Sequence, residues 1–196
     1  MKRIIVGITG ASGVIYGIRL LEVMREQQNI ETILIMSDTA KENIILETQY
    51  TLDKVVALAD SCYDSHFLAA PVASGSYPTD AMVITPCSMK TLAAIAHGYS
   101  ENLIVRAADT TLKEGRRLVL CPRETPLSAI HLSNMLSLAR IGVGIIPPIP
   151  AFYNQPASID DLVNHHIMKV MDYMGLSFQI SKRWGIPDPG ADKPEP

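Results

Sequence analysis

Residues 2–13 read KRIIVGITGASG, and they run directly into VIYGIRLL at residues 14–21. The β-branched run from Ile4 to Ile8 has no clean alternation, which is typical of a strand buried on both faces of a parallel sheet. After the glycines, apolar residues recur at helical spacing from Val14 to Met24. This stretch therefore predicts a strand, a glycine-rich turn and a helix N-terminus, whose free N–H groups and dipole favour an anion such as a phosphate.

The glycine pattern of this turn is by itself a weak functional signal. Gly7-x-x-Gly10-x-x-Gly13 is neither the dinucleotide pattern G-x-G-x-x-G nor a Walker loop. Gly10 and Gly13 permit positive φ and a close approach of the backbone to a ligand, but the same glycines could serve only the packing of a tight turn. The position at the first strand-to-helix junction favours a ligand site somewhat over that alternative.

Length and composition restrict the class of protein. The chain has 196 residues, of which 47% are hydrophobic and 19% charged, so it fits one globular domain with a sizeable core. Its net charge of −3 argues against a general nucleic-acid binder, although it does not exclude a local basic pocket. The three cysteines form no C-x-x-C pair, and no apolar run reaches the length of a membrane span. We therefore expect a reduced, cytoplasmic protein that binds neither nucleic acid nor membranes.

Strands alternate with helices along the chain. Spacing and capping residues predict strands at 4–8, 32–36, 81–85, 117–122 and 143–146, and helices at 14–24, 38–46, 51–60, 92–96, 102–113, 127–140 and 159–174. The segment 61–80 has no clear period and is predicted to be a long functional or interface loop. The alternation predicts one α/β domain over residues 1–181, with a doubly wound, Rossmann-like or flavodoxin-like parallel sheet, followed by a tail over 182–196.

Polar side chains follow two of these strands at their carboxyl ends, where open α/β sheets bind ligands. Ser37 follows the strand at 32–36, while Ser88, Lys90 and Thr91 follow the strand at 81–85. Hydroxyls and a positive charge at a strand-to-helix junction suit an anion or a heterocycle. An equally good alternative for the second junction is a serine N-cap beside a solvated lysine.

Charged residues stand at two further places. Arg123 and Glu124 follow the strand at 117–122. A charged pair at a strand end suggests a site, because buried charges need partners, but an ordinary surface pair is the alternative. Glu47 lies at the end of a predicted helix, where the dipole disfavours an anion, so the residues alone favour an exposed acid there.

Several metal and nucleophile patterns are absent from the sequence. The five histidines form no metal pattern, and the adjacent His165 and His166 diverge by about 100° on a helix, so they would not chelate from one face. Asp160 and Asp161 lack the rest of a D-D-x-x-D motif and are explained by a helix N-terminus. No G-x-S-x-G nucleophile elbow occurs either. We therefore predict no metal site.

Longer motifs are spread over nearly the whole chain. They are GITGASG at 7–13, ASGSY at 73–77, PCSMKTL at 86–92, RAAD at 106–109, LKEGRRLVL at 112–120, PRETPLS at 122–128, IHLSNML at 130–136, PPIPAFYNQP at 147–156 and KRWG at 182–185. Through them the chain resembles the UbiX-like flavin prenyltransferase family, which includes the small accessory subunits encoded beside aromatic and phenolic acid decarboxylases. PCSMKTL, PRETPLS and PAFYNQP are far more specific than the opening glycines.

The resemblance implies a metal-independent transferase that joins the dimethylallyl group of dimethylallyl monophosphate to N5 and C6 of reduced FMN. The product, prenylated FMN, is the cofactor of a UbiD-type decarboxylase, which would receive it. The resemblance assigns FMN binding to Gly10, Ala11, Ser12, Ser37, Ser88, Met89, Lys90, Thr91 and Arg123. It assigns prenyl phosphate binding to Lys113, Arg123, Glu124, Tyr153 and Lys169. Lys169 stands where many relatives carry arginine, so it keeps the charge but loses the bidentate fork.

The resemblance also implies catalytic roles. Ser12 and Glu47 would face the flavin and handle protons there, and Glu124 would give a proton to the leaving phosphate. The aromatic surfaces of Tyr153 and Trp184 would shield an allylic cation.

The resemblance further implies a homo-oligomer, a dodecamer in this family. We expect the active site to lie at a subunit boundary. The apolar loop at 67–77 and the extended link at 147–153 offer more surface than one small domain covers.

Two other functions are weighed against this one. The first keeps FMN but oxidatively decarboxylates a peptidyl cysteine. It is disfavoured because PCSMKT at 86–91 replaces the Pro-Ala-Ser-Ala-Asn-Thr type segment of those enzymes. The second is a non-catalytic flavin carrier or accessory subunit, which the many phosphate-binding groups disfavour because FMN has a single phosphate.

Overall fold

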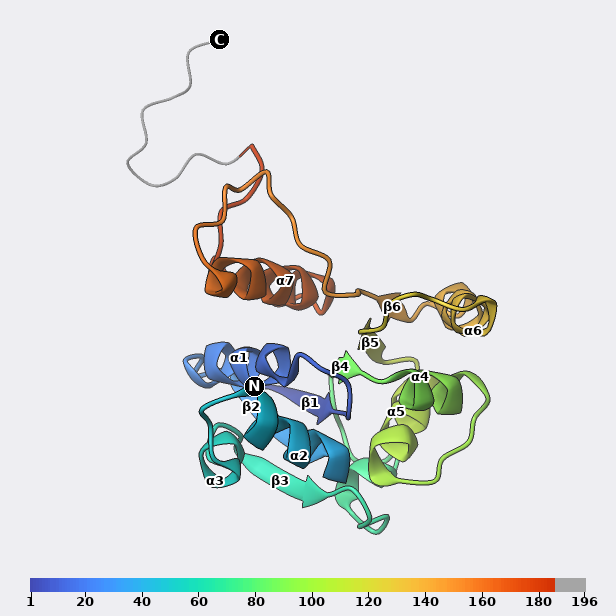
Figure 1. Ribbon diagram of the computed structural model, residues 1–196. Coiled ribbons are helices and arrows are strands. Elements are labelled where there is room, and N and C mark those ends of the chain that lie inside the picture. The colour runs from blue at the N-terminus through green and yellow to red at the C-terminus, as the bar shows by residue number, and fades with distance from the viewer. Residues whose placement is uncertain (186–196) are drawn as a thin grey trace.

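Six parallel strands form the centre of the structure, a computed structural model that describes residues 1–185 (Figure 1). The strands are β1 (Lys2–Ile8), β2 (Ile30–Met36), β3 (Ser61–Asp64), β4 (Ala81–Cys87), β5 (Arg117–Pro122) and β6 (Gly144–Ile145). The helices are α1 (Val14–Arg25), α2 (Asp38–Glu47), α3 (Leu52–Val56), α4 (Met89–Ala96), α5 (Leu103–Lys113), α6 (Ala129–Arg140) and α7 (Ile159–Tyr173), with a 3-10 turn at Pro71–Ala73. The predicted α/β class and parallel sheet are confirmed.

The strand order is β3-β2-β1-β4-β5-β6, so the chain runs outward from β1 in one direction and then returns to continue from β4 in the other. In such sheets the loops after the two central strands leave to opposite faces and open a crevice at their carboxyl ends. The residues that follow β1 and β4 are the glycine-rich turn at 9–13 and the segment 88–91. The topology therefore brings these two motifs to the same edge of the sheet.

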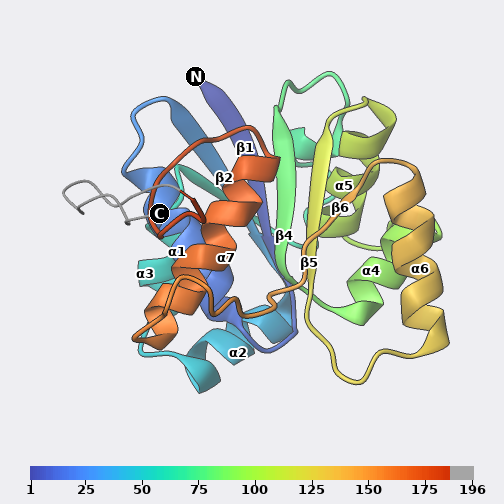
Figure 2. The same cartoon turned by 90° about the horizontal axis from the view of Figure 1, so that it is seen from above.

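Two apolar layers cover the sheet. Ile4, Val6 and Ile8 of β1 pack with α1, α2 and α7, whereas Ile5 packs with α4 and α5 on the other face (Figure 2). Burial on both sides explains why β1 is apolar without alternation. α1 lies very close to β4, since a Cβ added at Gly17 would be 2.5 Å from the carbonyl oxygen of Thr85.

Side-chain caps define where most of the helices start. The residues that accept a hydrogen bond from the first turn of their helix are Ser37 (α2), Thr51 (α3), Ser88 (α4), Asn102 (α5), Ser128 (α6) and Ser158 (α7). Such caps satisfy N–H groups that the helix itself leaves unpaired. Because Ser88 caps α4, this helix begins at Met89 and not at 92, as the sequence had suggested.

The segment 51–80 differs from the sequence-based expectation. The helix expected at 51–60 is only α3, and the loop expected at 61–80 contains the edge strand β3 and the 3-10 turn. The carboxylate of Asp60 accepts hydrogen bonds from Thr32 N at 2.7 Å and Thr32 Oγ1 at 3.0 Å, which fixes the chain against β2. β3 is short, polar and paired on one side, so it has no apolar pattern by which to predict it.

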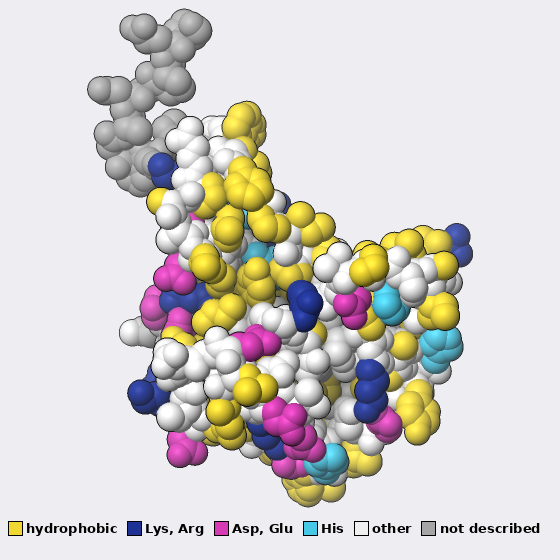
Figure 3. Space-filling view, in the orientation of Figure 1, with side chains coloured by type: hydrophobic (Ala, Val, Ile, Leu, Met, Phe, Trp, Pro, Cys, Tyr) yellow, Lys and Arg dark blue, Asp and Glu magenta, His cyan; other side chains and the backbone are white. Residues whose placement is uncertain are grey.

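α6 lies at one side of the molecule, next to α4 and β6 (Figures 1 and 2). α6 buries only Asn134 and Leu138, and it exposes Ile130, Leu132 and Leu136. Figure 3 shows hydrophobic side chains gathered over this part of the molecule. An apolar surface of this kind is typical of a protein–protein interface. Within residues 1–185, none of the helices combines the length and the apolarity needed to cross a bilayer.

Candidate active site

The glycine-rich turn and the N-termini of α2 and α4 enclose a hollow at the carboxyl edge of the sheet. It has about 590 Å³ of atom-free space, part of it open to solvent. Five of the residues expected to bind FMN line it: Gly10, Ser37, Ser88, Lys90 and Thr91. Both serines are helix N-caps, so the alternative of a serine N-cap is confirmed for Ser88. The same residue also lines the hollow.

Two contacts hold this cradle together. Ser88 N donates to Thr9 Oγ1 at 2.7 Å, and that hydroxyl donates to Pro86 O at 2.9 Å, so the turns after β1 and β4 are joined. On the other side, a Cβ added at Gly10 would lie 2.5 Å from Cβ of Thr39 in α2. Only glycine lets the turn approach α2 this closely. Hydroxyls, two helix N-termini and apolar side chains such as Ile104 make a donor set that fits a phosphate and a flat heterocycle, and so fits FMN.

Lys90 lies at the rim of the hollow and is not simply solvated. Its ammonium is 2.7 Å from Oε1 of Glu101, which also lines the hollow, although the Lys90 side chain is 78% exposed. A bound phosphate would compete with Glu101 for this charge. Two other expected FMN residues flank the cradle: Ala11 is buried in the turn, and Met89 is the first residue of α4.

Three residues expected to act on the flavin meet at the glycine-rich turn. The Glu47 carboxylate accepts hydrogen bonds from Gly13 N at 2.8 Å and, more weakly, from Val14 N at 3.4 Å. Arg123 Nε donates to the carbonyl oxygen of Ser12 at 3.1 Å. Glu47 is an exposed acid, as the residues alone indicated, but it also caps the N-terminus of α1. The structure therefore gathers Ser12, Glu47 and Arg123 around one loop.

Glu124 lies beside Arg123 on the surface. Its Oε1 accepts a hydrogen bond from Thr125 N at 3.0 Å, and the side chain is exposed. Within this chain Glu124 thus stands at the carboxyl end of β5, next to a residue that contacts the turn.

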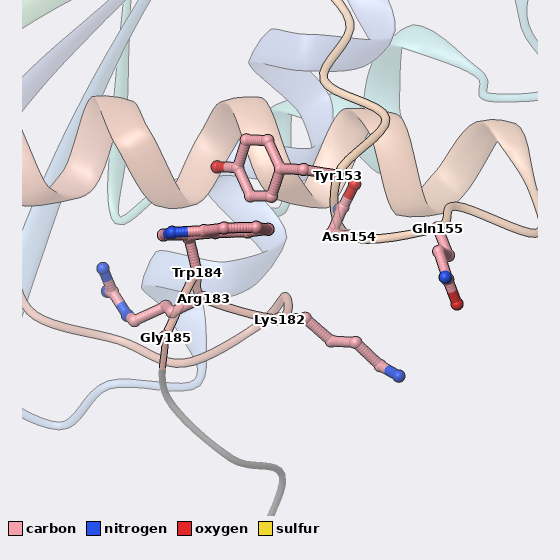
Figure 4. A pocket seen from close by; sticks show the side chains of 7 residues that line it. All are labelled: Tyr153, Asn154, Gln155, Lys182, Arg183, Trp184 and Gly185. Atoms are coloured by element: carbon pink, nitrogen blue, oxygen red, sulfur yellow. The ribbon is translucent and has the colours of Figure 1, made fainter. Parts of the chain in front are cut away.

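A second group of expected substrate residues forms around α7 (Figure 4). The rings of Tyr153 and Trp184 meet edge to face with centroids 5.6 Å apart, and both residues line a hollow of about 540 Å³ of atom-free space, part of it open to solvent. Tyr153 Oη lies 2.6 Å from Nε2 of His165. Lys169 follows His165 by one helical turn, so the two share a face of α7. Tyr153 therefore contacts both Trp184 and His165, and Lys169 lies on the same face of α7 as His165, a residue that its sequence pattern had not marked as part of a site.

The next histidine of α7 has different surroundings. The ring of His166 packs edge to face on Tyr16 of α1 with centroids 4.9 Å apart, and its Nε2 has no hydrogen-bond partner within residues 1–185. Burial lowers the pKa of His166 to about 4. His165 and His166 therefore do not bind one ion, and residues 1–185 hold no cluster of three or more histidine, cysteine or acidic side chains that could bind a metal.

Lys113 is not brought to either group within one chain. It is the last residue of α5, whereas Asn102 and Val105 at the start of that helix line the cradle. At the rise of an α-helix the two ends are about 15 Å apart. Lys113 Nζ lies near Glu114, at 3.2 Å from Oε1, and beside Gly75 at the amino edge of the sheet.

Comparison with known proteins agrees with this geometry. The Flavoprotein family model matches residues 1–171. The flavin prenyltransferase LpdB of Lactiplantibacillus plantarum is 55% identical over 184 residues, which cover 94% of this chain and 98% of that protein. A dodecameric FMN-dependent UbiX-like decarboxylase from Escherichia coli O157:H7 has a TM-score of 0.92 and 53% identity, covering 93% of this chain and 98% of its own. AnUbiX, solved with FMN and dimethylallyl pyrophosphate, has a TM-score of 0.92 and 48% identity, covering 95% and 99%. The chain belongs to the Flavoprotein family and, within it, to the UbiX-like flavin prenyltransferases.

Proposed function

We propose that this protein joins the dimethylallyl group of dimethylallyl monophosphate to N5 and C6 of reduced FMN. The observation that carries the proposal is the meeting of Ser12, Glu47 and Arg123 at the turn beside the cradle. It occurs in a chain 55% identical to a named flavin prenyltransferase. Reduced FMN supplies the nucleophilic nitrogen and carbon to which the new bonds are made.

The chain's part in binding FMN follows from the donors at the cradle. Ser37 and Ser88 stand at helix N-termini, where N–H groups and the dipole favour the phosphate of FMN. Gly10, Ala11 and Ser12 present the backbone of the turn. The remaining assigned contacts are Met89, Lys90, Thr91 and Arg123.

Breaking the carbon–oxygen bond of an allylic phosphate builds negative charge on the leaving group. Lys169, Arg123 and the hydroxyl of Tyr153 would stabilise this charge, because charge-assisted hydrogen bonds strengthen as the charge grows. Glu124, when protonated, would donate its proton to the departing phosphate. The ring of Trp184 against Tyr153 would cover the allylic cation and keep water away.

Bond formation at the second flavin position requires removal of a proton from a ring carbon. Glu47 would accept this proton, with Ser12 beside it. The hydrogen bond from Gly13 N to its carboxylate at the turn supports this role. A carboxylate held in this way is ready to accept a proton without reorganisation of the loop.

A second copy of the chain would supply Lys113. This residue lies about 15 Å from the cradle along α5, so it reaches a site only if that site belongs to a neighbour. The exposed apolar face of α6 offers a surface for that neighbour, and the relative from Escherichia coli O157:H7 is dodecameric. We propose a symmetric homo-oligomer, a dodecamer by the same likeness, with its active sites at subunit boundaries. Light scattering that gave an active monomer of 21.4 kDa would refute it.

The product would serve a UbiD-type decarboxylase of aromatic acids. The rival function, a flavin carrier or accessory subunit of such a decarboxylase, requires FMN binding and no turnover. Two separate groups of phosphate-binding side chains, at the cradle and on α7, favour the enzyme over the carrier.

One assay decides between these functions. Reduced FMN and dimethylallyl monophosphate are incubated anaerobically with the protein, and the flavin is then analysed by mass spectrometry. The transferase yields flavin heavier by one dimethylallyl unit, the carrier returns FMN unchanged, and a peptidyl-cysteine decarboxylase would instead act on a cysteine-terminated peptide in a parallel incubation. If the mass of the flavin stays unchanged even with the enzyme in excess over FMN, the proposal is overturned.

A further inference from the structure

A buried histidine lies directly behind the hydroxyl of Tyr153. Tyr153 Oη and His165 Nε2 are 2.6 Å apart, and the two rings meet edge to face with centroids 5.4 Å apart. Tyr153 is 50% exposed, whereas His165 is only 7% exposed. The Tyr153 ring is therefore open to solvent on one side, while its hydroxyl contacts the buried side chain of His165 on α7.

The surroundings favour the uncharged form of this imidazole. Burial lowers the pKa of His165, and the ammonium of Lys169 lowers it further. The neighbouring His166 is also uncharged at neutral pH, because burial lowers its pKa to about 4. A neutral imidazole has one nitrogen that donates and one that accepts, so the tautomer of His165 decides the direction of its hydrogen bond to Tyr153.

The direction of that bond decides what Tyr153 can do. A phenol has a single proton to donate. If Nε2 of His165 carries hydrogen and donates to Tyr153 Oη, the phenolic proton is free for an acceptor outside the protein. A phosphate held by Lys169, on the same face of α7 as His165, would be such an acceptor and would favour this tautomer.

We propose that His165 is a positioning residue, which fixes the hydroxyl of Tyr153 and turns its proton toward the phosphate of the prenyl donor. The proposal rests on the proposed function, since it takes the phosphate to bind beside Tyr153. It differs from that function in assigning a task to a side chain that need not touch the substrate.

The kinetic test compares four variants with the wild-type protein. His165→Phe keeps a ring of similar size and removes both nitrogens. We expect it to raise KM for dimethylallyl monophosphate about tenfold, with a smaller change in kcat, as for loss of one hydrogen bond to a charged group. His165→Gln, whose amide reaches close to the place of Nε2, should restore most of the loss. In a Tyr153→Phe background, His165→Phe should add almost nothing, because the two residues act as a unit.

His166→Gln is the matched control. This neighbour is as deeply buried in α7 but contacts Tyr16, so its replacement should leave KM unchanged. Should His165→Phe fail to fold, His165→Asn is the second loss-of-contact variant, because its amide is too short to reach Tyr153. Equal effects of His165 and His166 variants would show a general loss of packing and would overturn the proposal.

A second readout needs no turnover. Trp184 is the only tryptophan in the sequence, and it contacts the ring of Tyr153 at 5.6 Å, so its fluorescence should respond to dimethylallyl monophosphate added to the full-length protein. We expect about tenfold weaker binding for His165→Phe than for wild type. Unchanged affinity and KM in an active enzyme would refute the role of His165 alone. Weakened binding in a protein without turnover would support that role and refute the transferase function.

Discussion

Replacement of Glu47 by glutamine separates two tasks of this carboxylate. In the structure it accepts hydrogen bonds from Gly13 N at 2.8 Å and Val14 N at 3.4 Å, which holds the glycine-rich turn. In the proposed reaction it also removes a proton from the flavin ring. The glutamine amide oxygen can still accept from Gly13 N, but the amide cannot take up a proton at neutral pH. Glu47→Gln should therefore keep the turn and lose the base.

Losing the hydrogen bond and losing the base have effects of different magnitude, so one experiment can distinguish the two tasks. Changing a charged acceptor into a neutral one at a single good N–H contact costs about 1 kcal/mol or less for an exposed group, which is at most about fivefold in FMN affinity. Loss of a general base typically costs about 10²–10⁴-fold in rate. We therefore expect Glu47→Gln to bind FMN nearly as well as wild type and to form prenylated flavin at least about a hundredfold more slowly.

The assay is anaerobic rapid mixing, with absorbance recorded and the quenched flavin analysed by mass. FMN affinity is measured separately by quenching of flavin fluorescence. Glu47→Ala is the companion variant, since it loses both the acceptor and the base and should weaken FMN binding as well. Formation of prenylated flavin at the wild-type rate in Glu47→Gln would remove Glu47 from the mechanism.

Three further results are expected. Burial lowers the pKa of His166 from 6.5 to about 4, so on acidification the unfolded chain binds this proton first. His166 alone should therefore lower the free energy of unfolding by about 3 kcal/mol from pH 7 to 4. His166→Phe should remove this part of the fall in urea titrations, and an unaltered pH profile would contradict it. Gly17→Ala places Cβ 2.5 Å from the backbone oxygen of Thr85 and should destabilise by about 1–3 kcal/mol. Gly75→Ala, whose Cβ would meet the movable side chains of Glu114 and Lys113, should not. EDTA should leave turnover intact; its loss would show a metal requirement.

The features that were predictable from the sequence are those with a local signal. The apolar run of β1, the glycines after it and the helical spacing of α1 lie within one stretch of chain, and the structure has a strand, a turn and a helix there. Ser37 and Ser158 likewise cap α2 and α7 as their neighbours in sequence indicated. The tail assigned to 182–196 lies beyond the described residues from 186 onward, and its boundary stays a prediction.

The features that were missed depend on contacts between distant parts of the chain. Glu47 is 34 residues from Gly13, and Tyr153 is 12 residues from His165, across the loop at 154–158 and the start of α7. No spacing rule connects such pairs. The packing of α2 on α1 brings Glu47 to Gly13, and the return of the loop at 154–158 onto α7 brings Tyr153 to His165. The place of Lys113 could have been inferred. A helix that precedes a parallel strand ends at the amino edge of the sheet, opposite to the edge where Ser37 and Ser88 lie.

The place of Lys113 has a genetic consequence. If every site combines Lys113 of one chain with Glu47 of another, a Lys113→Ala chain and a Glu47→Gln chain are each inactive alone. In oligomers assembled at random from equal amounts of both, about a quarter of the sites would pair an intact lysine with an intact glutamate. Two defective alleles expressed together would then complement each other, whereas a chain carrying both substitutions would rescue neither.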